Sequence, residues 1–256
     1  MKSLFLLAAA LLTATAAYAD SYSFKEPFSR TAPFSATGEL SLDNVNGSVE
    51  IRTWDKNEIL IEGEKSAKTD EELKLIELTI DTAAPAAATI KVHLPKRPGA
   101  WFSGSNIRAA VTFKITVPAT ANLAHIRTVN SALTLDGLAG PVNAATVNGR
   151  ITVTALRGNA TLETVNGSLN ASFAALTAGQ RLFLDTTNGS ITVTLPANAG
   201  AAIDASVVNG YVDCDFPLTL SGGRIHGSSL KGAIGDARAA LRARTVNGSI
   251  HLVKKS

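Results

Sequence analysis

The feature that most constrains this chain is a short phrase, Val-Asn-Gly or a close variant, which returns at nearly regular intervals. From the second copy onward, successive asparagines are 18, 18, 22, 21 and 38 residues apart, and the last gap is about two periods. A fixed period near twenty residues is typical of stacked repeat architectures. The asparagines of the phrase are Asn46, Asn130, Asn148, Asn166, Asn188, Asn209 and Asn247.

Apolar residues recur at fixed distances from these asparagines. The positions one before, three after and five after are almost all apolar, as in Val147, Ile151 and Val153 around Asn148. The positions between them are mostly polar, and Thr recurs two before, as in Thr146. Alternation with a period of two is typical of a half-buried strand. We therefore expect the alternation to run unbroken through Asn-Gly, with all three apolar columns in the core.

A meander of hairpins is the alternative, because Asn-Gly between alternating runs is a strong hairpin signal. The residues that flank a two-residue hairpin turn lie on one face of the sheet. Here they would be Val147 with Arg150 and Val165 with Ser168, so an apolar residue would sit beside a polar one. Ser131 replaces Gly in one copy, so a positive φ is not required in every copy. Both observations favour stacked coils.

The predicted fold is all-β, a single-stranded right-handed parallel β-helix (β-solenoid) with coils of about 18–22 residues. The seven asparagines would then form one column and hydrogen-bond along the axis. A degenerate coil near residues 222–232, around His226, would fill the 38-residue gap.

The first 19 residues have the three parts of a secretory signal peptide. Lys2 is the basic region, residues 4–12 are the apolar region, and Ala17 and Ala19 mark a small-x-small cleavage site before Asp20. The apolar run is short for a membrane span. We expect an exported protein, periplasmic or secreted in the cell envelope, that is not transmembrane after cleavage.

Beyond the signal peptide at 1–19, residues 20–38 are expected to form a lead-in or N-terminal cap, and residues 39–256 the solenoid domain. Within it, 39–125 would be irregular coils with longer loops and 126–256 regular repeats. A solenoid end exposes unpaired strand edges, which is why a cap is expected.

Charge excludes some partners and suggests others. The formal net charge is +3, so nothing in the balance calls for nucleic acid. Residues 39–81 hold 12 acids against 5 bases, whereas residues 222–256 hold 7 bases against 1 acid. In a solenoid these segments would lie at opposite ends. Solvated ends that discourage edge pairing are the simpler interpretation; weak head-to-tail self-association, or docking on an anionic envelope surface, is the other.

One loop is the best candidate for a ligand contact. Lys96, Arg97, Trp101 and Phe102 place aromatic rings beside bases in a stretch rich in Pro, Gly and Ser. Such a loop could stack on a glycan or enter a membrane interface, or it could fold back and plug the solenoid wall.

The sequence gives little support for catalysis. Asp213, Asp215 and His251 fall on outward positions and could form an acid–base or metal group, but polar residues on a wet face are far commoner. No His or Cys spacing typical of a metal site occurs. Cys214, the only cysteine, is expected to be an inert core residue. We expect no catalytic residue, cofactor or metal.

The repeated Thr-Val-Asn-Gly-x-Ile/Leu units, together with residues 49–55 (Val-Glu-Ile-Arg-Thr-Trp-Asp) and 115–118 (Ile-Thr-Val-Pro), resemble the bacterial "putative adhesin" family of β-strand-repeat domains of unknown function. The resemblance covers residues 38–253, with Ser131 and the stretch around His226 as departures. It implies an exported β-helical protein and brings no catalytic residues to carry over.

These observations favour a non-enzymatic envelope or secreted protein, an adhesin or scaffold that binds envelope or surface polymers. Two alternatives stay open: a polysaccharide-active enzyme on a β-helix, and a structural partner in an envelope signalling complex.

Overall fold

The computed structural model describes residues 22–94, 108–219 and 228–255, and the regular secondary structure of this part of the chain is almost entirely β-strand. Its one short helix is α1 (Asp70–Lys74), which begins after Thr69 because the Thr69 hydroxyl accepts a hydrogen bond from the Glu72 amide at 3.2 Å. The prediction of an all-β fold is confirmed. The strands in chain order are β1 (Phe24–Pro33), β2 (Glu39–Asp43), β3 (Val49–Trp54), β4 (Glu58–Ala67), β5 (Glu77–Ala84), β6 (Ala87–His93), β7 (Ala109–Pro118), β8 (Asn122–Thr128), β9 (Leu133–Asp136), β10 (Val142–Asn148), β11 (Ile151–Leu156), β12 (Ala160–Asn166), β13 (Leu169–Phe173), β14 (Arg181–Asn188), β15 (Ile191–Leu195), β16 (Ala201–Asn209), β17 (Val212–Cys214), β18 (Ser229–Ile234), β19 (Ala239–Asn247) and β20 (Ile250–Lys254).

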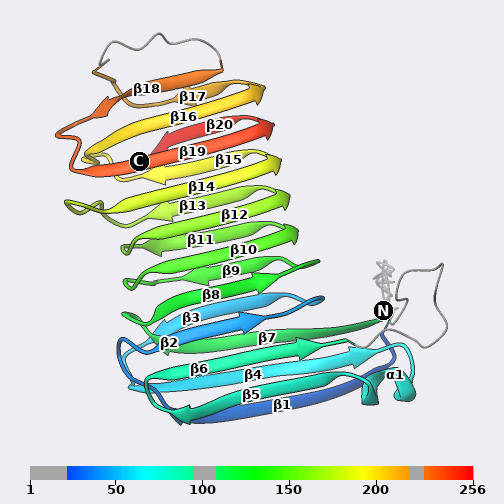
Figure 1. The fold of residues 1–256 in the computed structure, drawn as a ribbon. Coiled ribbons are helices and arrows are strands. Elements are labelled where there is room, and N and C mark those ends of the chain that lie inside the picture. The colour runs from blue at the N-terminus through cyan, green and yellow to red at the C-terminus, as the bar shows by residue number, and fades with distance from the viewer. Residues whose placement is uncertain (1–21, 95–107, 220–227, 256) are drawn as a thin grey trace, which may run out of the picture.

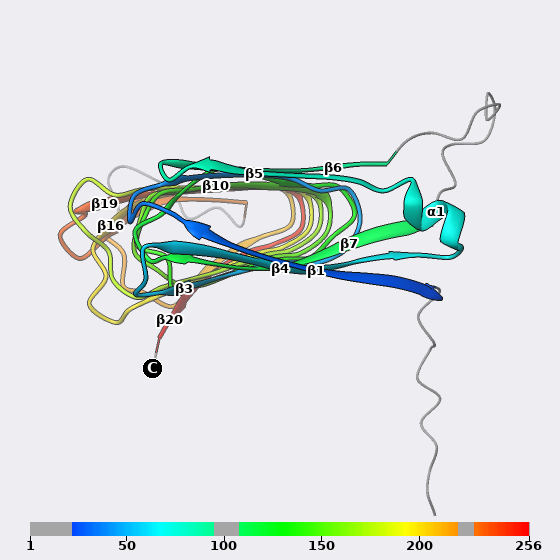
Figure 2. The ribbon, with the colours of Figure 1, turned by 90° about the horizontal axis from the view of Figure 1, so that it is seen from below.

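The strands form two ten-stranded sheets that face each other across the core (Figure 1). Sheet A has the order β1-β4-β7-β3-β9-β11-β13-β15-β20-β17, and sheet B has the order β18-β16-β19-β14-β12-β10-β8-β2-β6-β5. Seen along the stack, the two sheets enclose a flattened tube (Figure 2).

From β8 to β15 the chain alternates between the sheets, so each coil adds one strand to sheet B and one to sheet A. Successive coils pair in parallel and in the register of the repeat. Asn148 lies opposite Asn166, and Ile151 lies opposite Leu169. Neighbouring strands lie about 4.8 Å apart in such sheets, so equivalent side chains form columns along the stack. We call each level of this stack a rung.

Two coils are stacked out of chain order. The coil of β2 and β3 comes early in the sequence but lies between the level of β6 and β7 and that of β8 and β9. The coil of β19 and β20 lies between β14–β15 and β16–β17. Asn247 therefore neighbours both Asn188 and Asn209, which accounts for the 38-residue gap without a missing coil.

The prediction of a degenerate coil near residues 222–232 is therefore wrong for residues 228–232, the part of this range that the structure describes. Residues 220–227, including His226, lie outside the described residues. The residues that follow form β18, which pairs antiparallel with β16 at the end of sheet B and adds no rung to the asparagine column.

A single parallel β-helix does not describe the whole chain, because the sheets are mixed. β1 pairs antiparallel with β4, β4 with β7, β5 with β6 and β16 with β18. These strands lie at the ends of the stack, where a parallel edge would otherwise be left open. β1 falls within the segment expected as a cap, and Pro27 and Pro33 on it each lack an N–H for further pairing. Right-handed winding stays a prediction.

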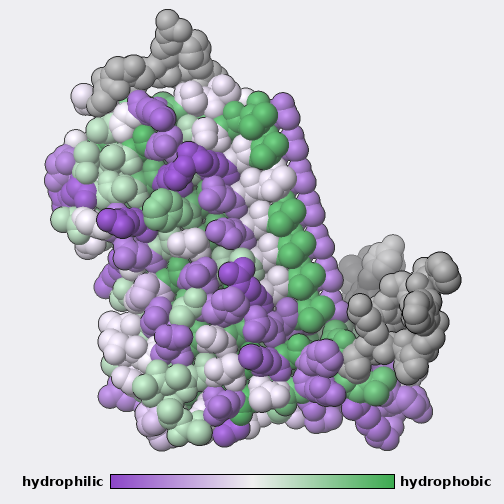
Figure 3. All heavy atoms as spheres, in the orientation of Figure 1, coloured by the Kyte–Doolittle hydropathy of each residue, from purple (hydrophilic) through white to green (hydrophobic). Residues whose placement is uncertain are grey.

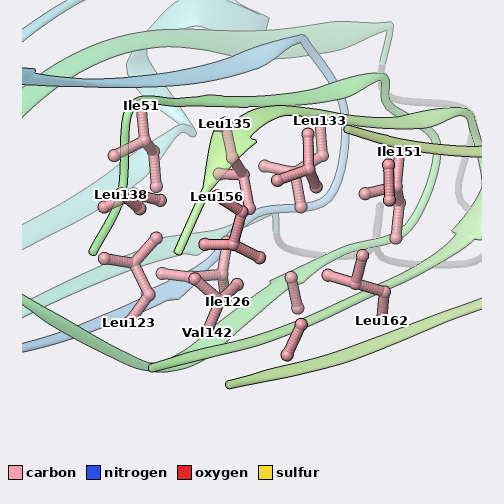
Figure 4. Close-up of a cluster of buried hydrophobic side chains, with 14 of the residues drawn as sticks. Ile51, Leu123, Ile126, Leu133, Leu135, Leu138, Val142, Ile151, Leu156 and Leu162 are labelled. Carbon is pink, nitrogen blue, oxygen red and sulfur yellow. The ribbon is translucent and has the colours of Figure 1, made fainter. Parts of the chain in front are cut away.

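The core lies between the sheets and consists of small and medium apolar side chains. The columns three and five after each asparagine point inward, and Ile151, Val153 and Leu169 are at most 1% exposed. From sheet B, Leu123 and Leu162 meet them (Figure 4). Burial of such side chains is the main term that stabilises the stack.

The Asn-Gly segment is neither a hairpin nor a continuous strand. β10 ends at Asn148, β11 begins at Ile151, and the two strands belong to different sheets. The chain turns a corner there, and the turn shifts the alternation by one residue. Before the asparagine, Thr146 points inward at 4% exposure and Val147 points outward at 40%. Our expectation that the valine column lies in the core is therefore wrong.

Candidate functional site

The asparagines of the repeat form a hydrogen-bonded ladder along the corner of the stack. Six of the seven Asn side chains donate from Nδ2 to the Oδ1 of a neighbouring rung at 2.7–3.0 Å. At the end of the ladder, Asn46 Nδ2 donates instead to the Ala109 carbonyl at 3.0 Å. Every carboxamide inside the ladder therefore both donates and accepts. In stack order the ladder is Asn46, Asn130, Asn148, Asn166, Asn188, Asn247 and Asn209.

Glycine follows the asparagine because the rungs approach closely at this corner. A Cβ placed on Gly167 would lie 1.8 Å from the carbonyl oxygen of Gly149 on the next rung. The Gly167 amide donates instead to the Asn188 carbonyl at 3.0 Å, so the corner backbone is itself hydrogen-bonded from rung to rung.

Threonine precedes the valine, and in four of the five copies its hydroxyl donates to a backbone carbonyl inside the corner; Thr128 is the exception. Thr164 donates to the Gly149 carbonyl at 3.2 Å, and Thr245 donates to the Gly189 carbonyl at 2.9 Å. A buried hydroxyl is tolerated when it is hydrogen-bonded. This burial is what sends the neighbouring valine outward.

The outward residues form an exposed apolar stripe beside the asparagine ladder, seen as a green column in Figure 3. Four of its valines are 37–42% exposed, and Val208 is 70% exposed. One threonine interrupts it. In stack order this valine stripe is Val45, Val129, Val147, Val165, Thr187, Val246 and Val208.

A second outward column lies two residues before the stripe on the same strands of sheet B. It carries charges of both signs, and each member lies opposite the next in the strand register. We call it the charged column. In stack order it is Lys91, Asp43, Arg127, Ala145, Glu163, Asp185, Arg244 and Ser206.

The stretch of the stripe from Val45 to Thr187 and the stretch of the charged column from Asp43 to Asp185 line a shallow groove of about 650 Å³ on the outer face of sheet B. Within the chain, the charged column makes exposed contacts: Asp43 lies 3.4 Å from His125, Arg127 Nε donates to the His125 ring at 3.0 Å, and Arg244 lies 4.0 Å from Asp204. Exposed ion pairs of this kind contribute little to stability, so these charges stay available to a partner.

The contact loop predicted from the sequence cannot be placed against this groove. Lys96, Arg97, Trp101 and Phe102 lie outside the described residues.

The structure brings together part of the candidate acid–base group. His251 Nδ1 lies 3.9 Å from Asp213 Oδ2, and the His251 ring meets Tyr211 edge to face at 5.5 Å. Asp215 turns elsewhere and accepts a hydrogen bond from the Lys254 amide at 3.2 Å. Across residues 22–94, 108–219 and 228–255, no three His, Cys, Asp or Glu side chains gather in a way that could hold a metal.

Cys214 lies beside this pair and is half-buried against the core. Burial raises the pKa of its thiol, and the neighbouring carboxylates of Asp215 and Asp213 raise it further. The thiol is therefore a weak nucleophile at neutral pH.

Sequence reasoning found the asparagine column but missed the valine stripe. The signal was present, because a threonine recurs directly before the valine and both cannot face inward on one strand. Five buried threonines, at 4–6% exposure, mark the inward column: Thr128, Thr146, Thr164, Thr186 and Thr245.

No helix in the described part of the chain is long and apolar enough to span a membrane. The fold and the repeated corner define the class as an all-β repeat protein with stacked two-strand coils. The sequence model of the Toastrack DUF4097 family matches residues 126–253, which is half of the chain. The chain belongs to this family.

Solved structures resemble the chain at low sequence identity. A putative cell adhesion protein from Clostridium sporogenes is 14% identical with a TM-score of 0.52, and the match covers 90% of this chain and 100% of that one. A putative adhesin from Bacteroides fragilis is 10% identical with a TM-score of 0.36, covering 89% and 97%. The first likeness supports the fold alone. No curated protein matches the chain.

Proposed function

We propose that this protein is an exported, non-enzymatic adhesin or scaffold of the cell envelope that makes contact through the valine stripe. One observation carries the proposal: valines that a repeat protein could bury recur on the outside of successive rungs, 37–70% exposed. A contiguous apolar patch rimmed by polar groups is typical of an interaction surface.

The shape of the surface supports a long partner. Seven rungs at about 4.8 Å give a stripe of about 29 Å, with the asparagine ladder on one side and the charged column on the other. Protein interfaces commonly have an apolar centre and a polar rim. Here the rim consists of neutral carboxamides on one side and charged side chains on the other. The names of the Clostridium sporogenes and Bacteroides fragilis proteins agree with an adhesive role.

The test measures binding of the exported chain to isolated envelope fractions and to arrays of surface glycans. Val147→Asp with Val165→Asp places two charges on the stripe, and we expect it to abolish binding. Thr152→Asp with Asn170→Asp places the same charges on adjacent rungs of the outer face of sheet A, and should bind as the unaltered chain does.

Equal binding by both double variants would remove the stripe from the proposal. Trp101→Ala with Phe102→Ala is the third arm, because it asks whether the contact loop carries the binding instead. If the unaltered chain binds no envelope component and no glycan, the adhesive role itself is wrong.

A polysaccharide-active enzyme is the second candidate, and one observation favours it. Glu163 and Asp185 lie opposite each other on adjacent strands in the groove. Paired carboxylates at about 5 Å serve retaining glycosidases. Release of reducing sugar from an acidic polysaccharide, lost in Glu163→Gln, would establish this function in place of adhesion.

A further inference from the structure

The order of charges along the charged column has a symmetry that the repeat does not require. Omitting the neutral residues, it runs Lys91, Asp43, Arg127, then Glu163, Asp185 and Arg244. Its signs are plus, minus, plus, a neutral rung at Ala145, then minus, minus, plus. We propose that the partner of the valine stripe is a second copy of this chain. This inference rests on the proposed function, because it names the partner of the same face.

The pairing places a two-fold axis along the strand direction, between β10 and β12. Such an axis sets the outer faces of two sheets B against each other and reverses the stack of one copy. Arg127 then faces Asp185 of the second copy, and Asp43 faces Arg244 of the second copy. By symmetry each contact occurs twice, so four pairs of opposite charge form.

The remaining rungs of this register bring no like charges together. Ala145 faces Glu163 of the second copy, and Lys91 faces Ser206 of the second copy. Shifting the second copy by one rung along the stack brings like charges together in either direction. A shift one way places Glu163 opposite Glu163 of the second copy, and a shift the other way places Asp43 opposite Asp185 of the second copy. Like charges directly opposite weaken an interface, so the column specifies one register.

The valine stripe faces itself in the same arrangement. Val147 meets Val165 of the second copy next to the axis, and Val45 meets Val246 farther out. The single threonine of the stripe, Thr187, meets Val129 of the second copy. Because the axis runs along the strands, the stripe meets the stripe and the charged column meets the charged column. Val208 lies outside this pairing, because its rung faces β6 of the second copy, which carries no stripe residue.

The available area suits a dimer of ordinary size. Strands of seven residues at about 3.3 Å and eight rungs at about 4.8 Å give a face of roughly 800 Å². A stable interface buries about 800 Å² on each partner. Figure 3 shows the stripe along one margin of this face and hydrophilic residues across it.

Sedimentation velocity of the exported chain over a concentration series is the test. The unaltered chain should dimerise, and Arg127→Asp or Asp185→Arg alone should raise the dissociation constant at least tenfold. The double variant Arg127→Asp with Asp185→Arg should recover to within about threefold of the unaltered chain, because the pair is restored with its signs exchanged.

Thr152→Asp on sheet A is the control for charge, and circular dichroism melts confirm that each variant is folded. A monomer at every soluble concentration, or a double variant as weak as the single ones, would overturn the inference. Binding to envelope fractions prepared without this protein separates the two proposals. If the protein is a monomer that binds such fractions through the stripe, the dimer proposal is wrong and the adhesive role stands. If it is a dimer that binds no fraction, the adhesive role is wrong and the dimer proposal stands.

Discussion

The central stack from β8 to β15 and the N-terminal foot are built from the same kind of strand but are held together differently. The foot consists of β1, β4, β5, β6, β7 and α1, and extends to one side of the stack in Figure 1. In the stack, residues 18 or 22 positions apart pair in parallel. In the foot, antiparallel strands close the end.

The side chains differ accordingly. The stack repeats one asparagine, one threonine and one valine per rung, except that Thr187 replaces the valine at β14, so each type forms a column along the stack. The foot uses individual contacts, such as Phe28 edge to face with Phe113 at 5.6 Å and Lys25 with Glu64 at 3.0 Å. Repetition produces a long uniform surface that can serve as an interface, and irregular pairing produces an end that resists further pairing.

Core packing should show the largest difference between the regions. Leu162→Ala removes a fully buried side chain from the middle of the stack and should lower the free energy of unfolding by about 2–5 kcal/mol. Phe28→Ala in the foot removes a half-buried ring and should cost about 1–2 kcal/mol. Urea unfolding of both variants checks the order, and a larger cost at Phe28 would contradict it.

The close approach of neighbouring rungs at the corner should give the next largest effect on stability. In Gly167→Ala the new Cβ meets a backbone oxygen at 1.8 Å, and we expect a loss of about 3 kcal/mol. Gly179→Ala is the control, since no atom lies within 4 Å of its Cβ and only its φ of 78° opposes the change, at about 1 kcal/mol. Equal losses would show that the rungs can separate without cost.

Much of this fold could be predicted from the sequence, and the failures have one physical origin. The period places Asn148 opposite Asn166, and the columns after the asparagine are inward as expected. Alternation alone cannot show where a chain turns a corner, because a two-residue turn changes its phase. The valine stripe was therefore assigned to the core.

The stacking order could not be predicted for a different reason. Repeats that share one pattern are interchangeable in principle, and their order depends on how the connecting segments close. Nothing local in β19 and β20 marks them for insertion between β14–β15 and β16–β17.

The asparagine ladder should contribute less to the free energy of unfolding than the core or the corner glycines, and an interior asparagine should contribute more than a terminal one. Asn166→Ala removes two side-chain hydrogen bonds inside the ladder, whereas Asn209→Ala removes one at its end. At about 0.5–1.5 kcal/mol for each bond, the interior variant should lose about twice as much stability. Thermal unfolding of both variants measures this, and equal losses would mean that the bonds do not act rung by rung.

The smallest effect concerns Cys214 at the far end of the stack. Its raised pKa leaves less thiolate at a given pH, so alkylation by iodoacetamide near pH 8 should be slower in the folded protein than in urea. The rate in the folded protein should rise with pH through a midpoint above that of the unfolded chain. A folded thiol that reacts as fast as the unfolded one would contradict its burial.

The most direct test of the central claim, that the corner turns threonine inward and valine outward, is a paired thermal melt of Thr146→Asp and Val147→Asp. The structure predicts that Thr146→Asp unfolds the protein or lowers its Tm steeply, because Thr146 is 4% exposed, while Val147→Asp, at 40% exposure, stays folded with a Tm near that of the unaltered chain. The opposite order would place the valines in the core and remove the surface on which both proposals depend.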